Sequence, residues 1–117
     1  MAKKDSPTLP AKTNVIIIGT GFAGSCMAIK LKEAGVHDFV VLEKGADVGG
    51  VWRENTYPGI ACDVPSHFYS YSFALNPEWS HRFSPGAEIQ AYFEDVARRY
   101  AITSRIRFGQ PITRCTF

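Results

Sequence analysis

The sequence lacks the features that mark several classes of protein. Its three cysteines, Cys26, Cys62 and Cys115, lie far apart, so neither a CxxC pair nor a zinc-ligand spacing exists, and we expect no metal site. An odd number of cysteines argues against a disulfide framework and fits a reducing compartment. No apolar run approaches the length of a membrane span, so no membrane partner is expected.

The sequence also lacks a strong net charge, and we expect no signal peptide. The net charge of +2 is too small to predict binding to nucleic acid or to an anionic membrane. Residues 1–13 are polar, contain two prolines and lack the apolar stretch of a signal peptide, so they predict a flexible tail. The expected location is therefore cytoplasmic. A chain of 117 residues supports one domain with one core.

What the chain does contain is a strand–helix–strand pattern typical of parallel α/β folds. Residues 14–18 are β-branched and continuously apolar up to a glycine, which predicts a strand buried on both faces. A helix follows, with Gly35 as its C-terminal cap and with an inner face expected at Ala23, Met27, Ala28 and Leu31. Residues 39–42 predict a second buried strand, and together these elements have the size of one βαβ unit.

The second half of the chain predicts a long loop, a helix and further strands. Residues 44–85 are rich in proline and aromatics, and a loop of this length usually indicates function or ordering by a ligand. Residues 85–100 predict a helix with Ser84 as N-cap. Its apolar residues recur every three or four positions, so one face of this helix is apolar and must pack against another part of the protein. Residues 105–108 predict a third strand, and residues 111–117 the start of a fourth.

The glycine pattern GxGxxG lies between the first strand and the helix, at residues 19–24. Gly19 permits the tight turn, Gly21 lets a pyrophosphate approach the backbone, and Gly24 allows close packing of helix and strand. Phe22 and Ala23 open the helix, whose free N–H groups attract a diphosphate. The pattern predicts a dinucleotide site, and the surrounding strand and helix disfavour the alternative of a glycine turn without a ligand.

An acidic residue, Glu43, follows the second predicted strand. A carboxylate at this position accepts hydrogen bonds from both ribose hydroxyls of an adenosine and repels a 2′-phosphate. The site is therefore expected to bind FAD or NAD rather than NADP. The alternative is that Glu43 is a solvated charge at the end of a strand.

A second signature follows within the loop. It reads Gly49-Gly50-Val51-Trp52, then Asn55, Tyr57-Pro58-Gly59, Cys62-Asp63, Ser66, Tyr69 and Ser72-Phe73. In order and spacing this stretch resembles the class B flavoprotein monooxygenases, and within them the Baeyer–Villiger type. Two positions depart from the family pattern, because Val51 replaces the commoner threonine and Ala61 stands where arginine is frequent.

The resemblance implies roles for particular residues. Gly50, Val51, Trp52 and Arg53 would lie along the diphosphate and ribityl chain of FAD. Asp63 would lie beside the isoalloxazine ring as the catalytic candidate, and Tyr69 would contact the cofactor. The alternatives are core packing for Trp52 and Tyr69 and a turn carboxylate for Asp63. Cys62 is expected to be a small buried apolar residue.

The resemblance also implies a fold and a reaction. The expected fold is a Rossmann-like βαβ parallel sheet, incomplete and ending in the start of an antiparallel hairpin, with residues 14–117 as the N-terminal portion of an FAD-binding domain. The parent enzyme would use NADPH, O₂ and bound FAD to insert oxygen next to a ketone or into a heteroatom such as that of a sulfide.

The family's second glycine turn for NADPH and its active-site arginine have no counterpart here. We therefore expect a fragment that is inactive alone, or one that is completed by another chain. The alternative is a free-standing nucleotide-binding or interaction module without turnover.

Overall fold

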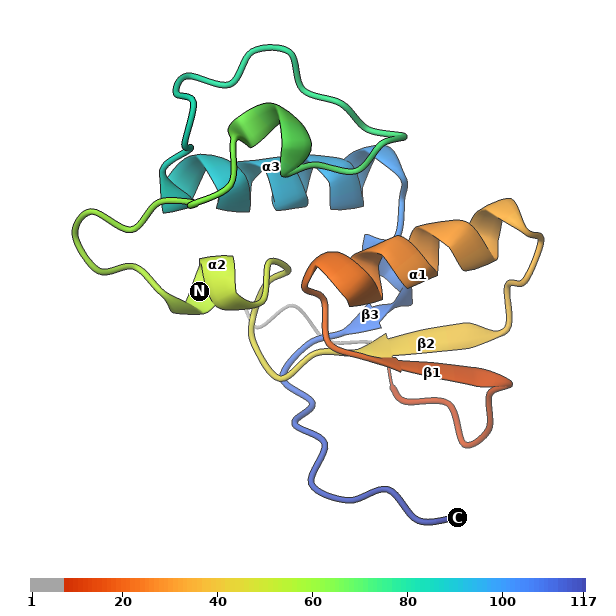
Figure 1. Ribbon diagram of the computed structural model, residues 1–117. Helices are drawn as coiled ribbons and strands as arrows, with labels where there is room; N and C mark the ends of the chain where they lie inside the picture. Colours follow the sequence, from red (N-terminus) through yellow and green to blue (C-terminus); the bar gives the residue numbers. More distant parts are fainter. Residues whose placement is uncertain (1–7) are drawn as a thin grey trace.

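The computed structural model describes residues 8–117 and contains a three-stranded sheet with helices packed above it (Figure 1). The expected flexible tail, residues 1–13, lies largely outside the described residues and stays a prediction. Within residues 8–117 no helix is long and apolar enough to cross a membrane. In chain order the elements are β1 (Val15–Ile18), α1 (Phe22–Glu33), β2 (Phe39–Leu42), α2 (Val51–Glu54), η1 (Ser66–Phe68), α3 (Gly86–Arg99), η2 (Thr103–Arg105) and β3 (Ile106–Arg107).

The sheet is parallel and has the strand order β1-β2-β3. Val15 is opposite Phe39 in the register of β1 and β2, and Val41 is opposite Ile106 in that of β2 and β3. The connection from β1 through α1 to β2 is the predicted βαβ unit. The Rossmann-like fold class is therefore confirmed.

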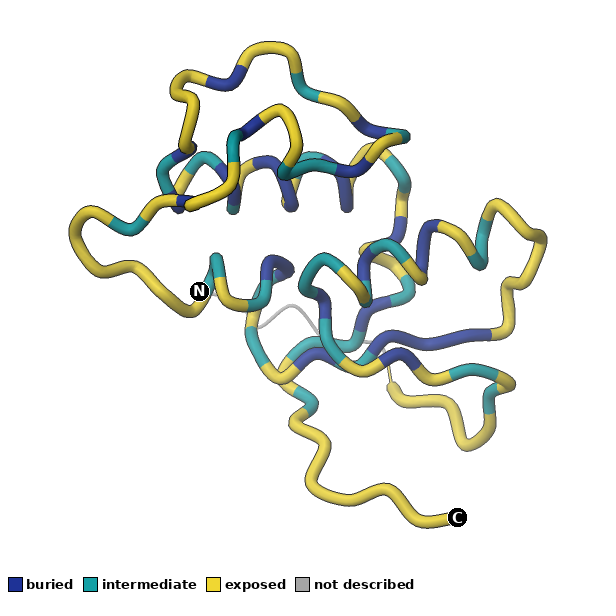
Figure 2. The backbone as a smooth tube through the Cα atoms, in the orientation of Figure 1, coloured by how far each residue is buried: buried dark blue, intermediate teal, exposed yellow. Residues whose placement is uncertain are grey.

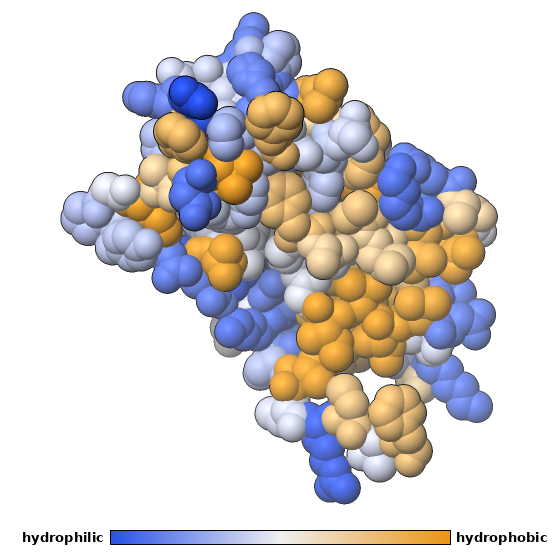
Figure 3. Space-filling model, viewed as in Figure 1, coloured by the Kyte–Doolittle hydropathy of each residue, from blue (hydrophilic) through white to orange (hydrophobic). Residues whose placement is uncertain are grey.

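The prediction that the first strand is buried on both faces is wrong. Ile17 is buried, but Ile16 and Ile18 are 57% and 58% exposed. The central strand β2 has neighbours on both sides, whereas β1 lies at an edge of the described sheet and has α1 on one face only. The other face of β1 forms part of an apolar patch on the surface in Figure 3.

The helix α1 has nearly the predicted bounds, but its inner face is displaced. Ser25, Ala28 and Ile29 are buried, while Met27 is 52% exposed and Ala23 is also exposed. The Ser25 hydroxyl donates to the Thr20 carbonyl, which turns this polar residue toward the sheet. The C-cap is Ala34, one residue before the predicted Gly35. Gly35 follows it with a φ of +76°, and its N–H donates to the Lys32 carbonyl, so the glycine closes the end of the helix.

The helix α3 agrees with the prediction for residues 85–100 except at its N-cap. The apolar positions that face the rest of the molecule are buried: Ile89, Tyr92, Phe93, Val96 and Ala97. Ser84 is not the cap, because Pro85 occupies that position and the Ser84 hydroxyl pairs with the Ser66 hydroxyl. The Ser84 carbonyl also accepts a hydrogen bond from the Cys62 N–H, so this residue joins two loop segments instead of capping a helix.

The predicted fourth strand and hairpin at residues 111–117 are wrong for this chain. The predicted third strand is short, Ile106–Arg107, and the chain then runs away from the sheet as an exposed extended segment (Figure 1). The Gln110 N–H still donates to the Glu43 carbonyl. Residues 111–117 have no pairing strand within the described part of the chain, and a strand requires such a partner.

The loop between β2 and α3 is ordered by tyrosine hydroxyls, and it contains two short helices, α2 and η1, that were not predicted. Tyr92 accepts from the Tyr71 N–H at 2.9 Å and donates to the Ala74 carbonyl at 2.7 Å. The Tyr71 hydroxyl donates to the Phe22 carbonyl at 2.6 Å. Buried positions recur along the loop where it passes over α3 (Figure 2). The loop thus packs as part of the core.

Candidate functional site

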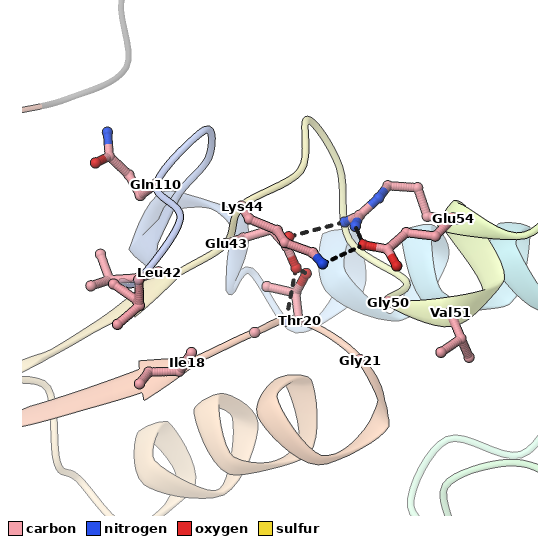
Figure 4. A pocket seen from close by; sticks show the side chains of 13 residues that line it. Ile18, Thr20, Gly21, Leu42, Glu43, Lys44, Gly50, Val51, Glu54 and Gln110 are labelled. Atoms are coloured by element: carbon pink, nitrogen blue, oxygen red, sulfur yellow. Dashed lines mark hydrogen bonds and ion pairs between the residues drawn. The ribbon is translucent and has the colours of Figure 1, made fainter. Parts of the chain in front are cut away.

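A cavity of about 330 Å³ opens at the carboxyl ends of β1 and β2 (Figure 4). In parallel α/β sheets this edge is where ligands bind. The first glycine turn, the segment after β2, the start of α2 and the segment after β3 form its walls. The lining residues are Ile18, Gly19, Thr20, Gly21, Leu42, Glu43, Lys44, Gly50, Val51, Arg53, Glu54, Gln110 and Ile112.

The first glycine turn has the geometry that its sequence predicts. Gly19 has a φ of +91°, and its N–H donates to the Leu42 carbonyl at 2.9 Å. A Cβ on Gly24 would lie 1.9 Å from the Gly19 carbonyl oxygen, so only glycine fits there. The first main-chain bond of α1 runs from the Ser25 N–H to the Gly21 carbonyl. The N–H groups of residues 22–24 therefore precede the helical ladder and are available to an anion.

The second glycine turn packs directly on the first. The Gly49 N–H donates to the Thr20 carbonyl at 3.0 Å, and a Cβ on Gly50 would lie 3.1 Å from the Gly21 Cα. Gly49 and Gly50 have φ values of +120° and +57°, which favour glycine. Two turns far apart in the sequence thus form one backbone surface beside the cavity.

Glu43 lines the cavity but is itself buried, and its carboxylate is held by the protein. One oxygen accepts from the Thr20 N–H at 3.1 Å and from the Thr20 hydroxyl at 2.6 Å. The other accepts from the Gly45 N–H at 2.6 Å and lies 3.1 Å from Arg53 Nη1. The protein itself thus supplies three hydrogen bonds and one ion pair to this carboxylate, which has about four lone-pair sites. The alternative of a solvated charge is therefore wrong.

These contacts also determine the charge of Glu43. Burial raises the pKa of Glu43, but the hydrogen bonds from Thr20 and Gly45 and the positive charge of Arg53 outweigh it. The pKa of Glu43 consequently lies below the ordinary value for glutamate, and the side chain is an anion at neutral pH.

Two aromatic residues of the second signature, Trp52 and Tyr69, pack together with Phe22 of the first. Phe22 and Tyr69 pack edge to face with centroids 4.7 Å apart, and Trp52 Nε1 donates to the Tyr69 hydroxyl at 3.0 Å. All three side chains contact the main hydrophobic core. The core-packing alternative therefore describes Trp52 and Tyr69 in this structure.

The structure brings about half of the predicted site residues to the cavity. Those that line it are Gly19, Gly21, Glu43, Gly50, Val51 and Arg53, whereas Phe22, Ala23, Gly24, Trp52, Asp63 and Tyr69 do not. Asp63 is exposed in a turn, and Cys62 beside it is buried, as expected for a small apolar residue. The cofactor and catalytic roles of these residues stay predictions.

Sequence reasoning missed Thr20 and Gln90. Thr20 occupies a variable position of the glycine pattern, and its partner Glu43 is 23 residues away. Gln90 of α3 donates from Nε2 to the Val48 carbonyl at 2.7 Å and thereby holds the segment before the second glycine turn. Both act through contacts that only the folded chain creates, so no local pattern indicates them.

Known proteins are similar to most of this chain. The family model described as an NAD(P)-binding Rossmann-like domain matches residues 17–96. A Baeyer–Villiger monooxygenase of Streptomyces coelicolor is 51% identical over 100 residues, which cover 86% of this chain and 19% of that protein. A Baeyer–Villiger monooxygenase of Pseudomonas aeruginosa is 48% identical over 105 residues, which cover 90% and 20%.

A solved structure agrees with these relatives. The crystal structure of OTEMO in complex with FAD and NADP superposes with a TM-score of 0.80 at 33% identity, covering 91% of this chain and 20% of that one. The chain thus spans about one fifth of the length of the curated relatives it matches. The glycine turns, the parallel sheet and these similarities lead to one conclusion: the chain belongs to the NAD(P)-binding Rossmann-like domain family, and the relatives that it resembles there are Baeyer–Villiger monooxygenases.

Proposed function

We propose that the cavity binds the ADP moiety of FAD, and that this chain is the FAD-binding portion of a Baeyer–Villiger type monooxygenase. The observation that carries the proposal is the contact between the two glycine turns, where a Cβ on Gly50 would lie 3.1 Å from the Gly21 Cα. Bare backbone, free N–H groups at the start of α1 and the absence of side chains suit a diphosphate.

The residues around the cavity supply the remaining contacts. Glu43 is the ribose acceptor in this proposal, and a ribose hydroxyl reaches it by replacing the Thr20 hydroxyl, which can rotate while the backbone donors of Thr20 and Gly45 hold the carboxylate. Val51 forms the wall next to the diphosphate, and Arg53 lines the cavity beside Glu43. The core packing of Trp52 and Tyr69 provides an apolar support behind the cofactor.

The activity of the longer relatives belongs to the same proposal. When bound, FAD supplies the redox chemistry by which NADPH and O₂ oxidise a ketone or a heteroatom substrate. Asp63 is the candidate beside the flavin ring, since its exposed position leaves it available to a cofactor or to another segment. We also propose a cytoplasmic location and completion of the fold by another chain.

Equilibrium binding of nucleotides tests the proposal. FAD should bind the purified protein and should be displaced by ADP, because the two share the moiety that the cavity holds. Adenosine 2′,5′-bisphosphate should compete at least tenfold more weakly, since its 2′-phosphate would approach the Glu43 anion. A nucleotide module without a flavin role would bind ADP, NAD and FAD alike. A protein that takes up neither FAD nor ADP would refute the proposal.

A further inference from the structure

We propose that Arg53 is a positioning residue that holds the Glu43 carboxylate as an oriented anion for ribose recognition. The inference rests on the proposed function, because it concerns the same cavity. It assigns Arg53 a role that acts through Glu43, whereas the resemblance implies direct contact between Arg53 and the cofactor.

The guanidinium of Arg53 joins three separate segments. Nη1 lies 3.1 Å from a Glu43 oxygen after β2 and donates at 2.5 Å to the Asp47 carbonyl in the following loop. Nη2 donates at 2.9 Å to the Glu54 carboxylate of α2. The Arg53 side chain is only 17% exposed and that of Glu43 only 4%, so solvent screens this ion pair little. The planar, permanently charged guanidinium suits such a bridge better than an ammonium group does.

Gly45 makes room for this arrangement. A Cβ at Gly45 would lie 2.3 Å from Arg53 Cζ, so the guanidinium packs on bare backbone. The Gly45 N–H donates to the same Glu43 oxygen that Arg53 contacts. Gly45, Glu43 and Arg53 therefore form one unit, in which the glycine is required by the position of the arginine.

No other cation in the described chain contacts the Glu43 carboxylate. Lys44, the next residue, is 66% exposed and pairs with Glu54 at 3.2 Å (Figure 4). From the glycine turn Thr20 supplies neutral donors, and from β3 Arg107 offers Glu43 its backbone carbonyl while its guanidinium donates to the Ser104 carbonyl. Without Arg53, no positive charge would compensate the burial of the carboxylate. The protonated form of Glu43 would then become more stable relative to the anion.

Titration of Glu43 in the unliganded protein tests the proposal independently of any cofactor. Carboxyl ¹³C chemical shifts would be followed by NMR in the wild type, Arg53→Met, Arg53→Lys and Lys44→Met. We expect Arg53→Met to move the Glu43 transition to higher pH and Arg53→Lys to restore part of the shift. Lys44→Met removes the same charge nearby but no contact with Glu43, so it should produce a clearly smaller shift.

FAD binding of the same variants between pH 5 and pH 8 provides the second readout. In Arg53→Met the affinity should fall about tenfold for each pH unit below the raised Glu43 pKa, while the wild type stays nearly flat over this range. Gly45→Ala should act in the same direction, because its methyl group displaces the guanidinium without removing its charge. Circular dichroism of each variant would verify that the fold is retained.

The possible outcomes separate the inference from the proposed function. A Glu43 transition that is unchanged in both Arg53→Met and Gly45→Ala would overturn the inference, even if FAD affinity fell equally at every pH. A shifted transition in a protein that binds neither FAD nor ADP would support the Glu43–Arg53 coupling and refute the nucleotide function. A shifted transition together with acid-sensitive FAD binding would support both.

Discussion

Glu43 is a single residue on which the geometry of both glycine turns depends. Its carboxylate accepts hydrogen bonds from Thr20 in the first turn and from the Gly45 N–H before the second turn. It also pairs with Arg53 of α2, which follows the second turn. The position of Glu43 after a strand predicts a carboxylate at the cavity. It does not predict that groups of the protein itself would contact that carboxylate. That second property depends on the three-dimensional meeting of residues 20, 43, 45 and 53.

We expect Glu43→Gln to destabilise the protein by about 1–3 kcal/mol at pH 7, because the amide cannot accept all three hydrogen bonds or balance the Arg53 charge. The folded-state pKa of Glu43 is lowered, so its stabilising effect is fully present above the unfolded-state pKa. It is lost as pH falls through the folded-state pKa. Urea unfolding at pH 7 and at pH values below 4 should therefore show a difference from wild type that shrinks in acid.

The matched control for this prediction is Glu33→Gln. Glu33 lies on the outer side of α1 and forms an exposed pair with Lys30 at 2.8 Å. Exposed pairs contribute less than about 1 kcal/mol, so this variant should change little. Equal losses of stability in the two variants would contradict the structural role assigned to Glu43.

The glycines of the first turn and its helix differ in why they are required. Gly24→Ala should destabilise the protein by roughly 3 kcal/mol or more, or prevent folding, because its Cβ would overlap the rigid Gly19 carbonyl at 1.9 Å. Gly35→Ala should cost about 1 kcal/mol, since its φ is +76° but open space surrounds it. Thermal and urea unfolding of both variants would check this order, and a reversed order would contradict the packing of α1 against β1.

At the scale of elements, β1 shows how an edge position overrides a sequence pattern. Continuous β-branched residues predict burial on both faces, yet only Ile17 is buried. The pattern shows which side chains can be buried without cost. Whether a face of the strand is buried depends on whether another element packs against it. The approximate bounds of α1 and α3 were predictable from local residues, but the inner face of α1 and the N-cap of α3 were not, because these depend on contacts with the rest of the chain.

We expect Ile17→Ala to destabilise the protein by about 2–4 kcal/mol, because it leaves a cavity under α1. Ile16→Ala removes the same atoms from a side chain that is 57% exposed and should cost less than about 1 kcal/mol. Chemical denaturation of the two variants checks this difference. A larger loss for Ile16→Ala would show that the open face of β1 is covered in solution.

At the scale of the whole molecule, the tyrosines attach the long loop to the two principal helices. Tyr92 of α3 bonds both the Tyr71 N–H and the Ala74 carbonyl, and Tyr71 bonds the Phe22 carbonyl at the start of α1. Burial raises the pKa of both tyrosines, so their hydroxyls remain protonated donors well above neutral pH. These hydrogen bonds therefore hold the loop, α1 and α3 together as one packed unit.

Tyr92→Phe should lower the free energy of unfolding by about 1–3 kcal/mol, because it leaves the buried Tyr71 N–H and Ala74 carbonyl unpaired. Hydrogen exchange at the Tyr71 amide should accelerate before that of β2 amides. Tyr57→Phe is the control, since Tyr57 is 62% exposed and should be neutral. Unchanged exchange at Tyr71 would contradict the attachment of the loop through Tyr92.

Sequence by itself determined the βαβ unit, the glycine turn after β1, the acid after β2 and the amphipathic helix α3. Each is encoded locally, in hydrophobic period, in glycine spacing or in a residue at the end of a strand. Tertiary structure decided that one face of β1 is exposed and that residues 111–117 form no strand. It also decided that Ser84 joins two loop segments and that protein donors hold the Glu43 carboxylate. These depend on what lies opposite a residue in space, which is why Arg53, a neighbour of Glu43 only after folding, became the residue through which the site can be tested.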